Sequence, residues 1–153
     1  MNIENIPCTK VAYIRQVGPY GDNNRQSMDK LKTWAISMDL LKEDSVLLGI
    51  AYDNPAFVEG NKCRYDTCLI IAEDSVINDT CIQEGRIQGG KYAVFQIAHT
   101  AEAVGKAWNT IFSAISSEGC QLDDDRPMME RYNFKLLKEH FCELCVPILS
   151  EKT

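Results

Sequence analysis

The sequence lacks the features that would direct it to a membrane or a secretory pathway. Its uninterrupted apolar runs fall short of the roughly 18 residues that a membrane-spanning helix requires. The opening segment Met1–Pro7 has neither the basic region nor the apolar stretch of a signal peptide. No Gly-, Ser- or Pro-rich linker interrupts the 153 residues. We therefore expect one domain over residues 1–153, located in the cytoplasm.

Motifs of nucleotide binding and of nucleophilic catalysis are also missing. Gly85, Gly89 and Gly90 fit neither G-x-G-x-x-G nor a P-loop. His99 and His140 are the only histidines, and no Ser/Cys–His–Asp order is recognisable. The 16 basic and 22 acidic side chains leave a net charge of −6, which disfavours a phosphate backbone as partner. We expect no cofactor and no direct binding of nucleic acid.

Two patterns resemble metal sites but are better explained otherwise. Cys142 and Cys145 form a C-x-x-C, yet the stretch that follows looks extended, and residues three apart on a strand face opposite sides. The seven cysteines are therefore expected to be reduced and mostly buried. Three adjacent carboxylates, Asp123–Asp125, precede Arg126 and Pro127, which is typical of a solvated turn. We expect no metal.

What the chain does contain is a repeated order of strand, helix, strand and strand. The two copies, at about residues 8–74 and 88–150, comprise strands 10–17, 46–52 and 63–72 with helix 24–40, and strands 91–97, 128–133 and 142–149 with helix 101–116. Each copy alone would leave its sheet half covered. This predicts an α+β fold in which duplicated βαββ units pair around a pseudo-twofold axis. We expect an antiparallel-rich sheet, two main helices, and a central ligand cleft where the halves meet.

One carboxylate in the second copy stands where the pattern predicts an apolar residue. Read as a strand, residues 128–133 place Glu130 and Tyr132 on one face. When Tyr132 is superposed on Tyr52 of the first copy, Glu130 takes the place of Ile50. The sequence therefore predicts a charge directed at an apolar, aromatic-lined surface. The alternative is that Glu130 is exposed to solvent, as charged strand residues usually are, or paired with Arg15 or Arg64.

Several segments, in the same order through nearly the whole chain, resemble the GyrI-like family, also called the effector-binding domain of AraC-type and multidrug-responsive regulators. They are Tyr13–Tyr20, Gly49–Pro55, Arg64–Asp66, Gly89–Phe95, Ala107–Phe112 and Glu130–Tyr132. The resemblance implies a duplicated βαββ fold whose hydrophobic cleft carries aromatic residues and a glutamate, at the position of Glu130, that receives cationic, lipophilic ligands. The sequence departs from the family at His99–Ala101, which replaces the second Gly-Pro-Tyr, and it has no counterpart of the regulators' helix-turn-helix half.

The leading hypothesis is a stand-alone binding domain for cationic or amphipathic drug-like molecules, with Glu130 as counter-ion. Such a domain would act as a sensor with a separate regulator, as a sink, or as a resistance factor. The aromatic side chains that could contact the ligand are Tyr13, Trp34, Tyr52, Trp108, Phe112 and Tyr132. The same side chains could equally be plain core.

Two further functions stay open. The resemblance also admits hydrolases of strained electrophilic toxins, in which Glu130 would orient or deprotonate water. It equally admits a protein-binding inhibitor of DNA gyrase, because some members of the family act in that way. Turnover abolished by Glu130→Gln would indicate the first, and inhibition of supercoiling that pocket substitutions do not affect would indicate the second.

Overall fold

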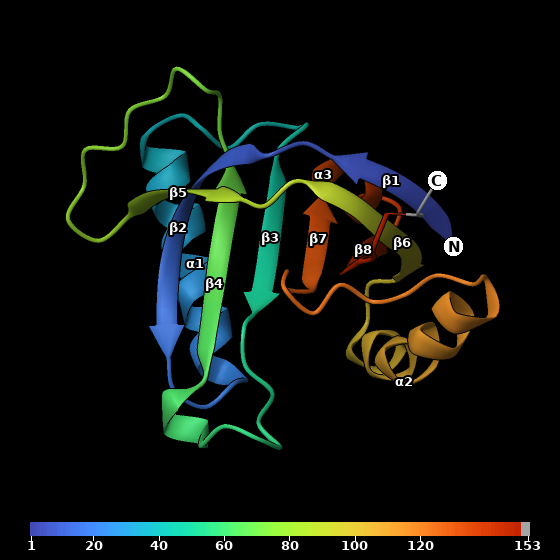
Figure 1. The fold of residues 1–153 in the computed structure, drawn as a ribbon. Helices are drawn as coiled ribbons and strands as arrows, with labels where there is room; N and C mark the ends of the chain where they lie inside the picture. The colour runs from blue at the N-terminus through green and yellow to red at the C-terminus, as the bar shows by residue number, and fades with distance from the viewer. Residues whose placement is uncertain (151–153) are drawn as a thin grey trace.

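A single eight-stranded antiparallel sheet, curled along its width, organises the chain in the computed structural model, which describes residues 1–150 (Figure 1). The strands are β1 (Asn2–Ile6), β2 (Thr9–Val17), β3 (Val46–Ala51), β4 (Arg64–Ile70), β5 (Gln83–Ile87), β6 (Gly90–Ala98), β7 (Met129–Asn133) and β8 (Phe141–Pro147). The helices are α1 (Asp22–Ser37), α2 (Ala101–Ser117), the short α3 (Phe134–Leu137) and the 3₁₀ turn η1 (Gly60–Lys62). The α+β class is confirmed. No helix among these residues has the length and apolar character needed to cross a bilayer.

The strand order is symmetric about the central pair β3 and β7. The order across the sheet is β1-β6-β8-β7-β3-β4-β2-β5, so that β4 and β2 follow on one side and β8 and β6 on the other. Two paired βαββ units would give this order. That the halves arose by duplication and superpose stays a prediction, as does their division at residues 8–74 and 88–150.

Two strands that the sequence reading did not include complete the sheet. β1 pairs with β6 and forms one edge of the sheet, and β5 pairs with β2 and forms the other. The side chains of β1 are exposed except at Ile6, and four of the five residues of β5 are not buried, so neither has the apolar run that marks a strand.

The sheet has an apolar core on each face. Its inner, curled face buries one cluster, whose members include Ile6, Val11, Leu48, Ile50, Cys68, Tyr92, Val94, Met129 and Cys145. On the outer face, α1 covers Ala12, Leu47 and Leu69, and α2 covers Ala93, Leu144 and Val146. Both helices therefore lie on one face, and the strands between them form the floor of the space that separates the helices.

The register of β3 and β7 determines which face of the sheet Glu130 occupies. Glu130 lies opposite Gly49, whereas Ile50 lies opposite Met129. Ile50 and Met129 both point into the inner cluster, so Glu130 points to the outer, helix-bearing face. Ile50 and Glu130 thus lie on opposite faces of the sheet, so the expectation that Glu130 takes the place of Ile50 was wrong about the face on which Glu130 lies. Gly49 is the residue of β3 that lies beside Glu130.

Candidate functional site

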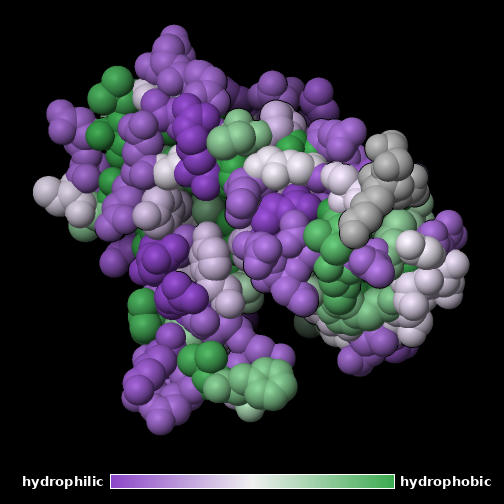
Figure 2. Space-filling model, in the orientation of Figure 1, coloured by the Kyte–Doolittle hydropathy of each residue, from purple (hydrophilic) through white to green (hydrophobic). Residues whose placement is uncertain are grey.

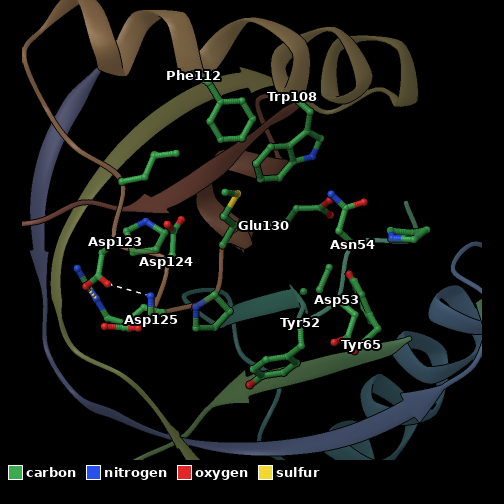
Figure 3. Close-up of a pocket in the computed structure, with 18 of the residues that line it drawn as sticks. Tyr52, Asp53, Asn54, Tyr65, Trp108, Phe112, Asp123, Asp124, Asp125 and Glu130 are labelled. Carbon is green, nitrogen blue, oxygen red and sulfur yellow. Dashed lines mark hydrogen bonds and ion pairs between the residues drawn. The ribbon is translucent and has the colours of Figure 1, made fainter. Parts of the chain in front are cut away.

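A cavity opens on the outer face between the two halves of the sheet (Figure 3). Its volume of about 960 Å³ lies within the range of small-molecule sites. β3 and β7 supply Gly49 and Glu130, and α2 supplies Trp108 and Phe112. The opposite wall and the rim include Tyr20, Ala51, Tyr52, Asp53, Asn54, Pro55, Tyr65 and Asp123–Met128. In the space-filling view the surface is hollowed between the segment that carries η1 and helix α2 (Figure 2).

Glu130 is half-buried in this cavity and accepts a hydrogen bond from a neutral group. The hydroxyl of Tyr132, two residues along β7, donates to Oε2 of Glu130. Burial of the Tyr132 ring, together with the negative charge of Glu130, raises the pKa of the phenol above its ordinary value. Tyr132 therefore stays protonated and remains a donor.

Neither arginine that was considered as a partner for Glu130 reaches it. Nε of Arg15 lies 2.8 Å from the carboxylate of Asp66, and Nε of Arg64 lies 3.0 Å from that of Asp53. Within residues 1–150, no Lys, Arg or His forms an ion pair with Glu130. The interpretation of Glu130 as an arginine-bridged or fully exposed strand residue was therefore wrong.

Tyr65 of β4 is a cavity residue that the sequence reading missed. A Cβ atom at position 49 would lie 2.0 Å from the Tyr65 hydroxyl oxygen, so the ring can lie over β3 only because residue 49 is glycine. Burial is the main cause that raises the pKa of Tyr65, and the charge of Glu130 adds to it. Two phenols, those of Tyr65 and Tyr132, therefore flank the carboxylate. The glycine opposite Glu130 could have revealed Tyr65, but only once the register was known.

Tyr20 supports Tyr65 from the segment before α1. Their ring centroids are 5.9 Å apart in an edge-to-face arrangement. The Tyr20 hydroxyl lies 2.9 Å from the carbonyl oxygen of Asp53 and 2.7 Å from that of Arg64. This residue thereby holds together the two ends of the loop that joins β3 to β4.

The predicted aromatic residues divide between the cavity and other places. Trp108 and Phe112 stack on each other along α2, with ring centroids 6.5 Å apart, and both line the cavity. Tyr52 lines its edge, where burial raises the pKa of the phenol to about 12. Tyr13 instead packs against the inner cluster, and Trp34, a residue of α1, packs against the cluster between that helix and the sheet. The structure brings neither Tyr13 nor Trp34 to the cavity.

The rim of the cavity is acidic. Asp123 is paired with the buried guanidinium of Arg126, with Nε 2.8 Å from Oδ2. Arg126 also donates to the carbonyl oxygens of Lys91 and Ile148, which fixes the rim segment against β6 and the residue that follows β8. Asp124 and Asp125 are exposed, and neither forms an ion pair with any residue of the described chain. The arrangement can attract and hold a positively charged molecule.

The family profile described as GyrI-like small molecule binding domain matches residues 1–149. A prophage-derived protein of Bacillus subtilis, YosT, named as a transcriptional regulator, is 38% identical over 97% of this chain and 98% of its own length. A protein of Salmonella typhimurium named DNA gyrase inhibitor is 27% identical over 80% of this chain and 79% of its own.

Solved structures share the fold at low sequence identity. In the EcmrR–DNA complex, the chain that matches has 14% identity and a TM-score of 0.74; the match covers 98% of this chain and 57% of that longer one. The structure of SAV2435 bound to tetraphenylphosphonium has 13% identity and a TM-score of 0.61, with 97% and 93% of the two chains covered. At these identities, the likeness shows the fold alone.

Proposed function

This chain belongs to the GyrI-like small molecule binding domain family, and we propose that its cavity binds cationic, lipophilic drug-like molecules with Glu130 as their counter-ion. The observation that supports the proposal is a half-buried carboxylate, among aromatic side chains, whose hydrogen-bond partner is the neutral hydroxyl of Tyr132. The structural neighbour solved with tetraphenylphosphonium, a lipophilic cation, makes this ligand class a natural first choice.

The energetics favour such a ligand. Removal of a carboxylate from water costs several kcal/mol unless a charge partner replaces the lost hydration. An organic cation supplies that partner, and each aromatic face adds a cation–π attraction of about 0.5–2 kcal/mol. Trp108 and Phe112 add a broad apolar surface on one side. Selection would then act on charge, flatness and hydrophobicity rather than on one particular molecule.

Calorimetric titration with tetraphenylphosphonium tests the proposal. We expect binding to the unmodified protein and a loss of affinity of about ten-fold or more in Glu130→Gln, because the amide keeps the shape and removes the charge. Glu118→Gln is the matched control, since Glu118 is exposed and lies outside the cavity lining. Equal binding by Glu130→Gln, or no binding by the unmodified protein, would contradict the proposal.

The names of the relatives motivate a second candidate function, inhibition of DNA gyrase. The measurement is a supercoiling assay with the purified chain. Inhibition that Glu130→Gln leaves unchanged would assign this function to a surface other than the cavity. Hydrolysis of electrophilic toxins stays a prediction, and product formation that Glu130→Gln abolishes would establish it. All seven cysteines are free thiols, in keeping with the cytoplasmic location that we propose.

A further inference from the structure

We infer that the cavity is built for molecules with two separated positive charges, one held by Glu130 and the other by Asp124 and Asp125 at the rim. The inference rests on the proposed function and specifies the class of ligand. It predicts that a bis-cation with an apolar aromatic body binds better than a monocation of the same body.

The charges that line the cavity support a second cationic group. The lining includes five carboxylates and a single cationic side chain, Arg126. Arg126 compensates Asp123, and Arg64, from just outside the lining, compensates Asp53. The charges of Glu130, Asp124 and Asp125 are left without a basic partner among residues 1–150. A monocation beside Glu130 would leave the two rim carboxylates uncompensated.

The positions of these carboxylates call for a ligand with a spacer. Glu130 rises from β7, whereas Asp124 and Asp125 lie on the segment that precedes β7, at one side of the cavity (Figure 3). Trp108 and Phe112 lie along α2 and supply apolar surface for the body of the ligand. The volume of about 960 Å³ is at the upper end for small-molecule sites, so an extended ligand has room.

The backbone segment that carries the rim carboxylates is held in place before any ligand arrives. The buried Arg126 donates to the carbonyl oxygen of Ile148 at 2.8 Å and of Lys91 at 3.0 Å. Within the turn, the backbone N–H of Asp125 donates to Oδ1 of Asp123 at 3.0 Å. Such preorganisation lowers the entropic cost of binding. Because Asp124 and Asp125 are exposed, salt will screen their attraction for the second charge.

A matched pair of ligands tests the inference on the unmodified protein. The bis-cation is two quinolinium rings joined by an alkyl chain, and the monocation is one quinolinium ring that carries an alkyl chain of the same length. We expect calorimetry at low salt to give the bis-cation about a three- to ten-fold higher affinity, an advantage that high salt removes. Across a series of chain lengths, the affinity of the bis-cation should pass through a maximum.

The double variant Asp124→Asn/Asp125→Asn locates the second charge. We expect it to abolish the advantage of the bis-cation, so that the paired ligands bind the variant with affinities within about two-fold of each other. Asp74→Asn/Glu118→Gln removes two exposed charges that do not line the cavity and serves as control. Equal affinity for the paired ligands, or an advantage that the rim variant keeps, would overturn the inference and leave the proposed function intact. If neither ligand binds, the proposed function itself fails.

Discussion

At the scale of single residues, the site depends on the contrast between Gly49 and Glu130, which face each other across β3 and β7. Glu130 carries the charge, and Gly49 provides the space into which the Tyr65 ring extends. The two residues thus place a carboxylate and a phenol on one patch of the floor. A side chain at position 49 would compete with Tyr65 for the same volume.

Gly49→Ala should therefore damage both stability and binding. The new Cβ would lie 2.0 Å from the Tyr65 hydroxyl oxygen and 2.9 Å from the ring carbon that bears it, so the ring must move. We expect the free energy of unfolding to fall by about 1–3 kcal/mol, as in other overpacked sites, and cation affinity to fall with it. Urea denaturation and calorimetry measure the two effects.

A double-mutant cycle identifies the cause of that loss. In a Tyr65→Ala background the obstructing ring is gone, so Gly49→Ala should cost little further stability. An equal cost in both backgrounds would mean that the backbone conformation of residue 49, and not its contact with Tyr65, requires glycine.

The sequence identified Glu130 but could not identify Tyr65. A carboxylate where a strand pattern predicts an apolar residue can be recognised from one short segment of the sequence. The approach of Tyr65 to Gly49 depends on the register between β3 and β4, which no local pattern records. The same limit explains why matching Glu130 to Ile50 gave the wrong face, because strand periodicity separates the two faces of a strand but does not give its alignment with a neighbour.

At the scale of elements, the helices were predicted closely, and the edge strands were missed. α2 begins where expected because the Thr100 hydroxyl accepts the N–H of Ala103, at 3.1 Å, and its apolar stripe packs on the sheet. α1 begins at Asp22 and ends at Ser37, two and three residues earlier than expected. β1 and β5 are held by backbone ladders to strands distant in the sequence and by ion pairs. Such contacts leave little hydrophobic periodicity in the sequence from which a strand could be predicted.

An arginine in β7 attaches β1 to the rest of the sheet. Arg131 donates to both carboxylate oxygens of Glu4 in β1, at 3.0 and 2.9 Å, and to those of Glu143 in β8. These hydrogen bonds lower the pKa of Glu4. A carboxyl group whose pKa is lower in the folded state stabilises the fold above its unfolded pKa, and this contribution is lost as the pH falls through the folded pKa.

Glu4→Gln should loosen β1 without unfolding the domain. Because the Glu4 side chain is 45% exposed, we expect a loss of only about 0.5–1 kcal/mol in the free energy of unfolding at pH 7, and a smaller loss in acid. Hydrogen exchange should accelerate in residues 2–6 and much less in β3 and β4. Glu43→Gln is the control, since Glu43 is exposed and forms no ion pair with a described residue. Unchanged exchange in β1 would show that its backbone ladder to β6 suffices.

At the scale of the whole molecule, the cavity forms where the two halves of the sheet meet. The repeated order of elements predicted this location, because each half brings one main helix to the same face. The lining of the cavity is asymmetric, because β7 contributes Glu130 where its neighbour β3 contributes Gly49. Both halves therefore supply residues of the cavity, and these residues become buried only when the entire chain folds. The pKa values of the buried phenols are thus coupled to folding.

This coupling predicts that the domain loses stability in alkali. Burial raises the pKa of Tyr52 to about 12 and shifts those of Tyr65 and Tyr132 in the same direction, with Glu130 adding to the shift of the latter two. Unfolded phenols titrate near pH 10. Above about pH 10 the unfolded chain therefore releases protons that the folded chain retains, and the free energy of unfolding falls as the pH rises.

Urea denaturation between pH 9 and pH 11, followed by phenolate absorbance, measures this effect. We expect part of the phenolate signal to appear only together with unfolding, and the urea midpoint to fall with pH. Tyr132→Phe removes one shifted phenol and should flatten the dependence, although the buried thiol of Cys145, whose pKa burial raises to about 12, keeps part of it. A phenolate signal that completes while the chain remains folded would mean that these rings are open to solvent, and the half-buried environment inferred for Glu130 would then be wrong as well.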